Sequence, residues 1–237
     1  MAKPASQVCY IIQARVSSKR VPRKMLRPFG GSSLAEIALQ KVLRSKFIHR
    51  DNFFFAVHEE PLRRLAEKHG LRVFPRSRRS AEAETEITEI YEWHDKLDFD
   101  YVVLINGCAP FLSVDTIDRF IAHYLAGSHR GLFSVLRKKN YFWSAEGVLA
   151  TPWPEGFTIM NTKFVEPTYE AAHCLYASRL DTIAQGIWMG DFRTANDPEL
   201  FVVDEYEAFD IDYPWQFDMA ESHYERHRQR IAKESLS

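Results

Sequence analysis

The sequence has few cysteines, and their spacing matches neither a disulfide framework nor a metal-binding motif. Cys9, Cys108 and Cys174 are widely separated in a chain of 237 residues, and no Cys-x-x-Cys pattern occurs. An odd, scattered set does not build the disulfide framework of a secreted protein and lacks the ligand spacing of a structural zinc site. We therefore expect free thiols, as in proteins of a reducing compartment.

Long apolar runs and a large net charge are also missing. The first apolar run, VCYII at 8–12, is too short for a secretory signal or a membrane span, and polar residues precede it. Lysine and arginine total 31 against 32 aspartates and glutamates, so no strong field attracts nucleic acid or an anionic membrane. We expect a cytoplasmic protein that binds neither.

The apolar residues that are present, 46% of the chain, are enough for the core of one domain spanning residues 1–237. Short apolar runs alternate with longer amphipathic stretches. We expect strands at 7–14, 52–57, 71–74 and 100–107. We expect helices at 59–70, 81–97, 113–127 and 213–234, and one more that starts at Ser33. This order predicts a three-layer α/β/α fold with a mostly parallel sheet.

The pattern changes after residue 130, where short strand-like runs are separated by turn residues. The runs are 131–136, 141–150, 173–178 and 200–205. They predict a small antiparallel extension of the sheet. The aromatic residues Tyr141, Phe142 and Trp143 in this region indicate a surface for a partner.

The segment QARVSSKRVPRKM, residues 13–25, concentrates positive charge near the N-terminus. Five cations stand in it, and the first acidic residue of the chain is Glu36. It follows the first strand, at the edge where open α/β sheets bind ligands, so it can form a phosphate site; a merely solvated loop is the alternative. The Walker pattern and GxGxxG are both absent.

The run IIQARVSSKRVPRKMLRPFGGSSL resembles the N-terminal signature of the acylneuraminate cytidylyltransferase family, I-P-A-R-G-G-S-K-R-I-P-x-K-N-L. The matching residues are Arg15, Ser18, Lys19, Arg20, Pro22, Lys24 and Leu26. The stretch MNTKFVEPTYEAAHCLYAS is similar to a second family pattern, N-T-Q-x-L-x-P-x-Y-x-x-x-G-A-x-Y. The resemblance implies a nucleotide-diphospho-sugar transferase type of fold.

Near the C-terminus, EAFDIDYPWQFDMAE is similar to the family's E-A-x-D-I-D-T-P-E-D-x-x-x-A-E. The resemblance makes Asp210 and Asp212 the ligands of a catalytic Mg²⁺. Alternate positions of an extended segment project to one face, so the two carboxylates can share a hard cation. An alternative role for Asp212 is that of N-cap for the helix that Pro214 begins.

The middle of the chain matches the family less well. LINGCAPFLSVDTID stands where the family has L-L-Q-P-T-S-P-L-R, with Pro110 kept. Other positions differ, namely Asn106, Cys108, Ala109 and Leu112, and Met25 stands where the family has asparagine. Related branches carry aspartate at the position of Cys108. These departures concern recognition of the base and the substrate more than phosphate chemistry.

The resemblance implies transfer of CMP from CTP to the anomeric hydroxyl of an acidic, sialic acid-like 2-keto-3-deoxy sugar, with release of pyrophosphate. It assigns catalysis to Arg15, Lys24 and Asp212. It assigns nucleotide binding to Ala14, Arg15, Ser18, Lys19, Lys24, Arg76, Asn106 and Pro110. A homodimer is also implied, with an extension around 135–170 as the contact.

Three alternatives differ in class: a family-like protein that binds a nucleotide without catalysis, an enzyme for a KDO-type acid or a phosphonate, and an RNA-binding module. The near-zero charge argues against RNA. His223 and His227, spaced i and i+4, could hold zinc but have no evident third ligand. Cys108 is more typical of a buried thiol than of a nucleophile, and His94 of a helix surface than of a base.

Overall fold

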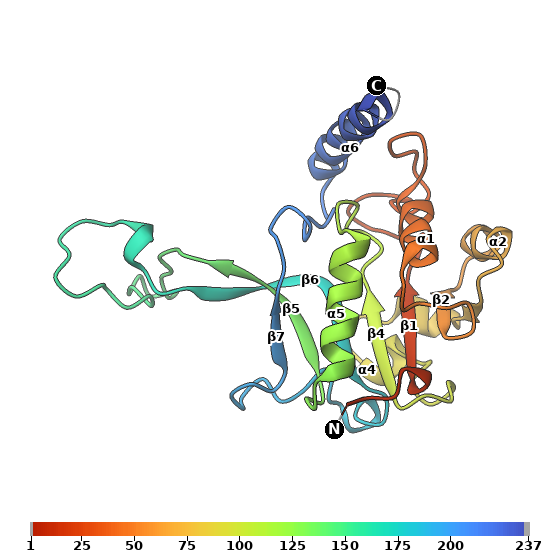
Figure 1. Cartoon of the computed structure of the whole chain (residues 1–237), viewed down its shortest axis with the longest axis horizontal. Coiled ribbons are helices and arrows are strands. Elements are labelled where there is room, and N and C mark those ends of the chain that lie inside the picture. The colour runs from red at the N-terminus through yellow and green to blue at the C-terminus, as the bar shows by residue number, and fades with distance from the viewer. Residues whose placement is uncertain (1, 235–237) are drawn as a thin grey trace.

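The computed structural model describes residues 2–234, with side chains for residues 2–227. A seven-stranded sheet organises the chain, in the order β3-β2-β1-β4-β6-β5-β7. The strands are β1 (Val8–Gln13), β2 (Phe53–Val57), β3 (Val73–Pro75), β4 (Tyr101–Ile105), β5 (Leu132–Lys138), β6 (Thr168–Arg179) and β7 (Glu199–Val202). β1 to β4 pair in parallel, whereas β6 is antiparallel to both β4 and β5 (Figure 1).

Helices connect the strands. The α-helices are α1 (Leu34–Arg44), α2 (Glu60–Lys68), α3 (Arg78–Glu82), α4 (Ile87–Ile90), α5 (Val114–Ala126) and α6 (Pro214–Glu234), and the 3-10 turns are η1 (Ala5–Gln7), η2 (Thr162–Phe164) and η3 (Ile183–Gln185). No helix in the described part of the chain is both long and apolar enough to span a membrane.

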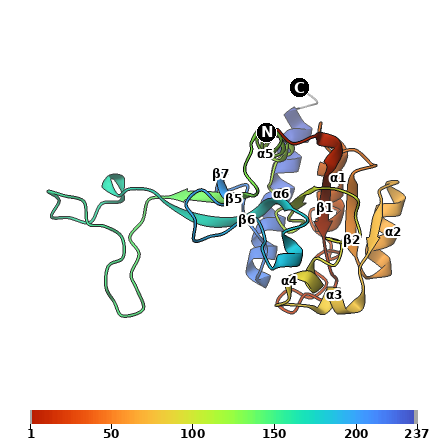
Figure 2. The same cartoon turned by 90° about the horizontal axis from the view of Figure 1, so that it is seen from below.

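The sheet is buried on both faces. Along β1, Tyr10 and Ile12 point into one core, with residues of α1 and α5, while Cys9 and Ile11 point into a second core around Trp93. This alternation is the period of two expected of a strand. Figure 2 shows α5 on one side of the sheet and the short helices α3 and α4 on the other, which confirms the three-layer prediction.

Two helices begin at the serines where the sequence predicted their starts, Ser33 and Ser113. The Oγ of Ser33 accepts a hydrogen bond from the backbone N–H of Glu36, and Ser113 caps α5 in the same way. In a Ser-x-x-Glu capping box the Glu36 side chain would also accept from the N–H of Ser33. That bond is absent among the described contacts, because the carboxylate of Glu36 instead pairs with His69 at 2.7 Å and accepts from Gln40.

The helix predicted over 81–97 is wrong. The segment contains the end of α3 and the four-residue α4, followed by turns. These turns let the fully buried Trp93 reach the second core, where its Nε1–H donates to Oε1 of Gln13 at 2.8 Å. His94 accordingly lies in a turn and not on a helix surface.

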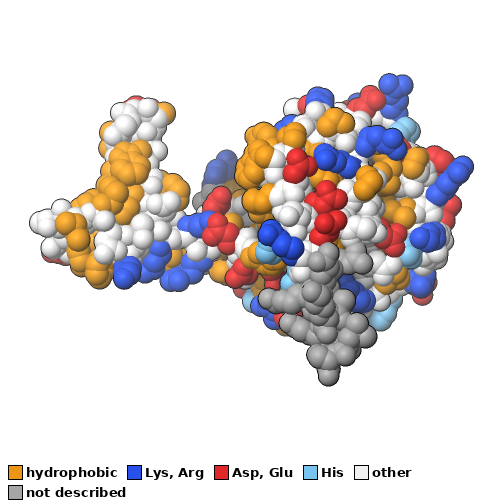
Figure 3. Space-filling model, turned by 90° about the horizontal axis from the view of Figure 1, so that it is seen from above, with side chains coloured by type: hydrophobic (Ala, Val, Ile, Leu, Met, Phe, Trp, Pro, Cys, Tyr) orange, Lys and Arg blue, Asp and Glu red, His pale blue; other side chains and the backbone are white. Residues whose placement is uncertain are grey.

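Residues 139–167, which we call the arm, extend from the far ends of β5 and β6 away from the body of the molecule (Figures 1 and 2). The strand predicted at 141–150 is wrong, because only an isolated bridge joins Trp143 to Leu149. Large apolar side chains of the arm are exposed, and Figure 3 shows them along its length. They are Phe142, Trp143, Val148, Trp153, Ile159, Met160 and Phe164.

Candidate active site

A cleft of about 640 Å³ opens beyond the carboxyl ends of β1 and β4. It is lined by Gln13, Ala14, Arg15, Ser18, Lys19, Arg20, Lys24, Met25, Arg76, Ala81, Ala83, Glu84, Ile90, Cys108 and Asp212. Six of the eight predicted nucleotide-binding residues are therefore here; Asn106 and Pro110 do not line it. The cleft thus lies at the edge of the sheet where the sequence places the cationic loop.

The cationic loop that follows β1 is anchored by its apolar residues. Val21 and Met25 are buried, and the Oγ of Ser18 accepts from the N–H of Val21. α6 holds the end of the same loop, because the ring of Phe29 packs edge-on against Phe217 at 5.3 Å. The loop thus has a fixed shape from which its charged side chains project.

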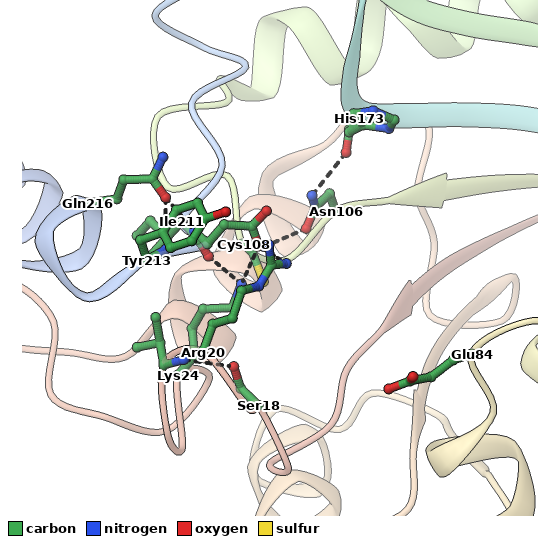
Figure 4. Close-up of polar contacts among 12 residues, drawn as sticks. Ser18, Arg20, Lys24, Glu84, Asn106, Cys108, His173, Ile211, Tyr213 and Gln216 are labelled. Atoms are coloured by element: carbon green, nitrogen blue, oxygen red, sulfur yellow. Dashed lines mark hydrogen bonds and ion pairs between the residues drawn. The ribbon is translucent and has the colours of Figure 1, made fainter.

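One group of these cations faces the acidic segment near the C-terminus. Arg20 pairs with Asp212 at 2.7 Å, and Lys24 lies 3.7 Å from the same carboxylate and donates to the backbone oxygen of Ile211 (Figure 4). The Asp212 carboxylate raises the pKa of Arg20. Segments 192 residues apart in sequence therefore meet in one site.

A second group faces Glu84, which the sequence analysis missed. Lys19 pairs with this carboxylate at 2.8 Å, and Arg15 lies 4.0 Å from it while donating to the backbone oxygen of Ala81. Glu84 belongs to the connection between α3 and α4, which the erroneous helix prediction hid. The lysines and arginines that the sequence predicted to bind phosphate are thus paired with carboxylates on both sides of the cleft.

Asp210 carries an oxygen without a partner. Its Oδ1 is buried and makes no hydrogen bond, and burial raises the pKa of the carboxyl, an effect that the nearby Lys24 opposes. Such an oxygen fits a hard cation, and Asp212 supplies a second carboxylate two residues on. No cluster of three or more His, Cys, Asp or Glu able to hold a metal occurs in residues 2–227, so the remaining ligands would be water and phosphate oxygens, as Mg²⁺ prefers.

The N-cap alternative for Asp212 is not the arrangement observed. The side-chain oxygen of Gln216 accepts from the backbone N–H groups of Asp212 and Tyr213, at 2.7 and 2.8 Å. Gln216 thus satisfies two N–H groups that precede α6, and among the described contacts no N–H of α6 donates to the Asp212 carboxylate, which faces the cations instead.

The remaining predicted nucleotide residues hold the frame of the site. Asn106 Nδ2 donates to the backbone oxygen of His173, and its Oδ1 accepts from the N–H of Cys108. Pro110 is buried, and its oxygen accepts from Lys41. Burial lowers the pKa of Lys41 to about 7.

Two of the predicted residues line the cleft while bonding inward. The guanidinium of Arg76, only 4% exposed, donates to Ser80 and to the backbone oxygen of Ile90, and burial lowers its pKa to about 10. The N–H of Ala14 donates to the backbone of Ala56. Neither polar group is directed to a ligand in this structure.

The departures from the family pattern at Met25 and Cys108 are in contact with each other. Their sulfur atoms lie 3.5 Å apart at the base of the cleft, and Met25 also fills the space over Gly107. Burial raises the pKa of Cys108 to about 11, which keeps the thiol protonated and disfavours a nucleophilic role. Sequence alone gave no sign that the two positions touch.

His223 and His227 of α6 do not line this cleft. Nε2 of His223 is 3.0 Å from the hydroxyl of Tyr206, and His223 and His227 line a separate hollow of about 560 Å³ with Tyr206 and Arg226. No third metal-ligating side chain joins them within residues 2–227.

Comparison with known proteins identifies the family. A family model described as Cytidylyltransferase matches residues 9–151. The spore coat polysaccharide biosynthesis protein SpsF of Bacillus subtilis is 31% identical over 130 residues, 52% of each chain. A 3-deoxy-manno-octulosonate cytidylyltransferase of Francisella tularensis is 28% identical over 136 residues, 54% of this chain and 50% of its own. The chain thus spans about half the length of these curated relatives.

Solved structures agree in fold. A CMP:2-keto-3-deoxy-manno-octonic acid synthetase complexed with CTP superposes with a TM-score of 0.69 at 12% identity, over 93% of this chain and 99% of that one. A 4-diphosphocytidyl-2C-methyl-D-erythritol synthase of Anaerococcus prevotii gives a TM-score of 0.63 at 17% identity, over 91% and 95%. Because the family model covers more than half of the sequence, the chain belongs to the cytidylyltransferase family.

Proposed function

We propose that this protein transfers CMP from CTP to the anomeric hydroxyl of an acidic 2-keto-3-deoxy sugar and releases pyrophosphate. The observation that carries the proposal is the pairing of the cationic loop with Asp212, two residues after Asp210, whose buried Oδ1 has no partner. Relatives named for the activation of 3-deoxy-manno-octulosonate support the acidic acceptor. A sialic acid-like sugar is a member of the same chemical class.

In this reaction the acceptor oxygen attacks the α-phosphorus in line and the bond to pyrophosphate breaks. Charge builds on the leaving oxygens, so the protein must supply cations there rather than a covalent nucleophile. Lys24, only 12% exposed at its side chain, would hold a phosphate oxygen, and Arg15 and Lys19 would exchange Glu84 for phosphate.

Asp210 and Asp212 would hold Mg²⁺, which when bound neutralises phosphate charge and lowers the pKa of the attacking hydroxyl. Arg20 would leave the Asp212 carboxylate, or share it, as the nucleotide enters. Because two carboxylates supply only part of the oxygen ligands that Mg²⁺ takes, oxygens of the bound triphosphate would supply others. Nucleotide and metal are therefore expected to bind together.

The test is to incubate the purified protein with Mg²⁺, each of the four ribonucleoside triphosphates and a panel of 2-keto-3-deoxy acids, and to follow pyrophosphate. We expect release that requires CTP, metal and one of the acids. Absence of release from every combination, with metal-dependent CTP binding retained, would instead favour a nucleotide-binding protein without catalysis.

A second candidate is transfer to a different acceptor, such as a phosphonate. The contact of Met25 with Cys108 favours it, because two positions where related patterns carry polar side chains here form an apolar base to the cleft. A phosphonate in the same panel, giving turnover where every keto acid fails, would select this candidate.

We also propose a homodimer in which the arm is the contact. Its apolar side chains include Val148 and Ile159, which are 65% and 64% exposed. Single exposed apolar residues are ordinary, but this many in one projecting segment indicate a covered surface. Light scattering of the full chain is the direct test.

A further inference from the structure

The turn between β4 and α5, residues 106–113, lies between the candidate site and α1. Cys108 lines the cleft from this turn, whereas the next residue, Ala109, is buried. Gly107 packs against α1, because a Cβ at this position would meet the side chain of Ala38 at 3.7 Å. The β4–α5 turn therefore has one side on the cleft and the other on α1.

The segment that carries Asp210 is bonded to the β4–α5 turn on each side of that residue. Before Asp210, the carboxylate of Glu207 accepts from the N–H of Ser113 at 3.2 Å and from its hydroxyl at 3.1 Å. After Asp210, the N–H of Ile211 donates to the carbonyl oxygen of Cys108 at 3.4 Å (Figure 4). The place of a proposed metal ligand therefore depends on where the turn lies.

Lys41 of α1 bonds to the middle of the β4–α5 turn and does not line the cleft. Its Nζ donates to the carbonyl oxygens of Ala109 and Pro110, at 2.8 and 2.9 Å, and the residue is only 7% exposed. Burial of the amine is costly and lowers its pKa to about 7. The ammonium group and the neutral amine both have at least two N–H groups, so both bonds can form in either state.

We propose that Lys41 is a positioning residue for the metal site, acting on Asp210 through the β4–α5 turn. The inference rests on the proposed function, because that function assigns Asp210 to Mg²⁺. Lys41 holds two carbonyls in the middle of the turn, and the turn holds the segment on each side of Asp210. Groups that orient the ligands of a metal typically change its affinity or the activity about 10- to 100-fold when they are removed.

The test compares Lys41→Met with Ser45→Ala. Methionine has nearly the length of lysine and fills the same space without an N–H donor. Ser45→Ala is the matched control, because it removes a hydroxyl that donates to Asp118 at the end of the same helix, and no described contact joins Ser45 to the turn. Each change should lower the unfolding temperature by about 2 to 6 °C.

CTP is titrated calorimetrically into each protein at a series of Mg²⁺ concentrations, without an acceptor. We expect Lys41→Met to need about tenfold more Mg²⁺ for half of the metal-dependent gain in CTP affinity, because Lys41 acts only through the turn. Its kcat for pyrophosphate release should also fall about tenfold, with the acceptor KM within about twofold of wild type. Ser45→Ala should match the wild type in all three quantities, and Lys41→Arg, which keeps N–H donors, should lie closer to the wild type than Lys41→Met does.

The same Mg²⁺ requirement in Lys41→Met and Ser45→Ala would overturn the role of Lys41 and leave CMP transfer intact. A higher requirement in Lys41→Met supports that role even if the wild type releases no pyrophosphate, in which case only the transfer is refuted. CTP binding to the wild type that does not depend on Mg²⁺ overturns the assignment of Asp210 to the metal, and with it that of Lys41. If Lys41→Met does not fold, Lys41→Gln, whose shorter side chain weakens the two bonds, replaces it with the same expected direction.

Discussion

Replacing Asp210 with asparagine should make the protein more stable and nearly inactive. Asparagine has almost the same shape as aspartate but carries no charge, so the packing of the segment is preserved. The change removes a carboxylate whose Oδ1 is buried without a partner and which sits near a second carboxylate, Asp212. The stabilisation is expected only in the absence of metal and nucleotide.

The magnitude follows from the cost of leaving a buried polar group unsatisfied, about 1 to 3 kcal/mol. Lys24 offsets part of this cost, because its charge favours the ionised form of Asp210. We therefore take the lower end, about 1 kcal/mol, which corresponds to a rise of about 2 to 4 °C in unfolding temperature for a domain of this size. Turnover should fall about 10²- to 10³-fold.

The assay is thermal unfolding with and without Mg²⁺ and CTP, followed by pyrophosphate release. The two ligands should raise the unfolding temperature of the wild type and raise that of Asp210→Asn much less, because binding to the native state alone stabilises it. Asp218→Asn is the matched control, since Asp218 is 66% exposed at its side chain and pairs with Arg27 on the outside of α6. A less stable Asp210→Asn with the wild-type ligand response would refute the reasoning.

Lys24→Met should lower kcat about 10²- to 10³-fold in the pyrophosphate assay and also lower the unfolding temperature, because the charge that favours ionised Asp210 is lost; unchanged turnover would remove Lys24 from the phosphate site. Lys41 has its pKa lowered to about 7 in the fold against about 10.4 when unfolded, so the unfolded chain binds more protons between these values. The unfolding free energy of the wild type should therefore rise from pH 7 to 10 relative to Lys41→Met; parallel urea curves at the two pH values would contradict this. Ile159→Asp should convert the proposed dimer to a monomer in light scattering, and a monomeric wild type would remove the dimer.

Much of the parallel half of the fold could be predicted from the sequence. β1, β2 and β4 are apolar without interruption because both faces are covered, and the serine caps of α1 and α5 are local signals. The cationic loop and the two aspartates could also be found, because each lies in a short contiguous motif. Their meeting across the cleft follows from the position of the loop at the carboxyl end of β1.

The wrong or missing predictions have a common physical cause, because tertiary contacts outweighed the local sequence pattern. Residues 81–97 have helical composition, but Trp93 had to enter the second core and bond Gln13, so turns replaced the helix. Glu84 became part of the site only through that change. His173 likewise has a left-handed φ of +53° where the pairing of β5 with β6 is irregular, and Asn106 donates to its backbone oxygen; neither feature is visible in a strand-like run.

The partners of the cationic loop also bear on the response of this protein to ionic strength. Lys19 and Arg20 already face the carboxylates of Glu84 and Asp212, so a triphosphate replaces one set of anions by another instead of neutralising bare charge. Dissolved salt weakens the ion pairs with Glu84 and Asp212 that are lost on binding as well as the ion pairs with the triphosphate that are gained. Nucleotide affinity should therefore fall less between low and physiological salt than the number of cations in QARVSSKRVPRKM suggests.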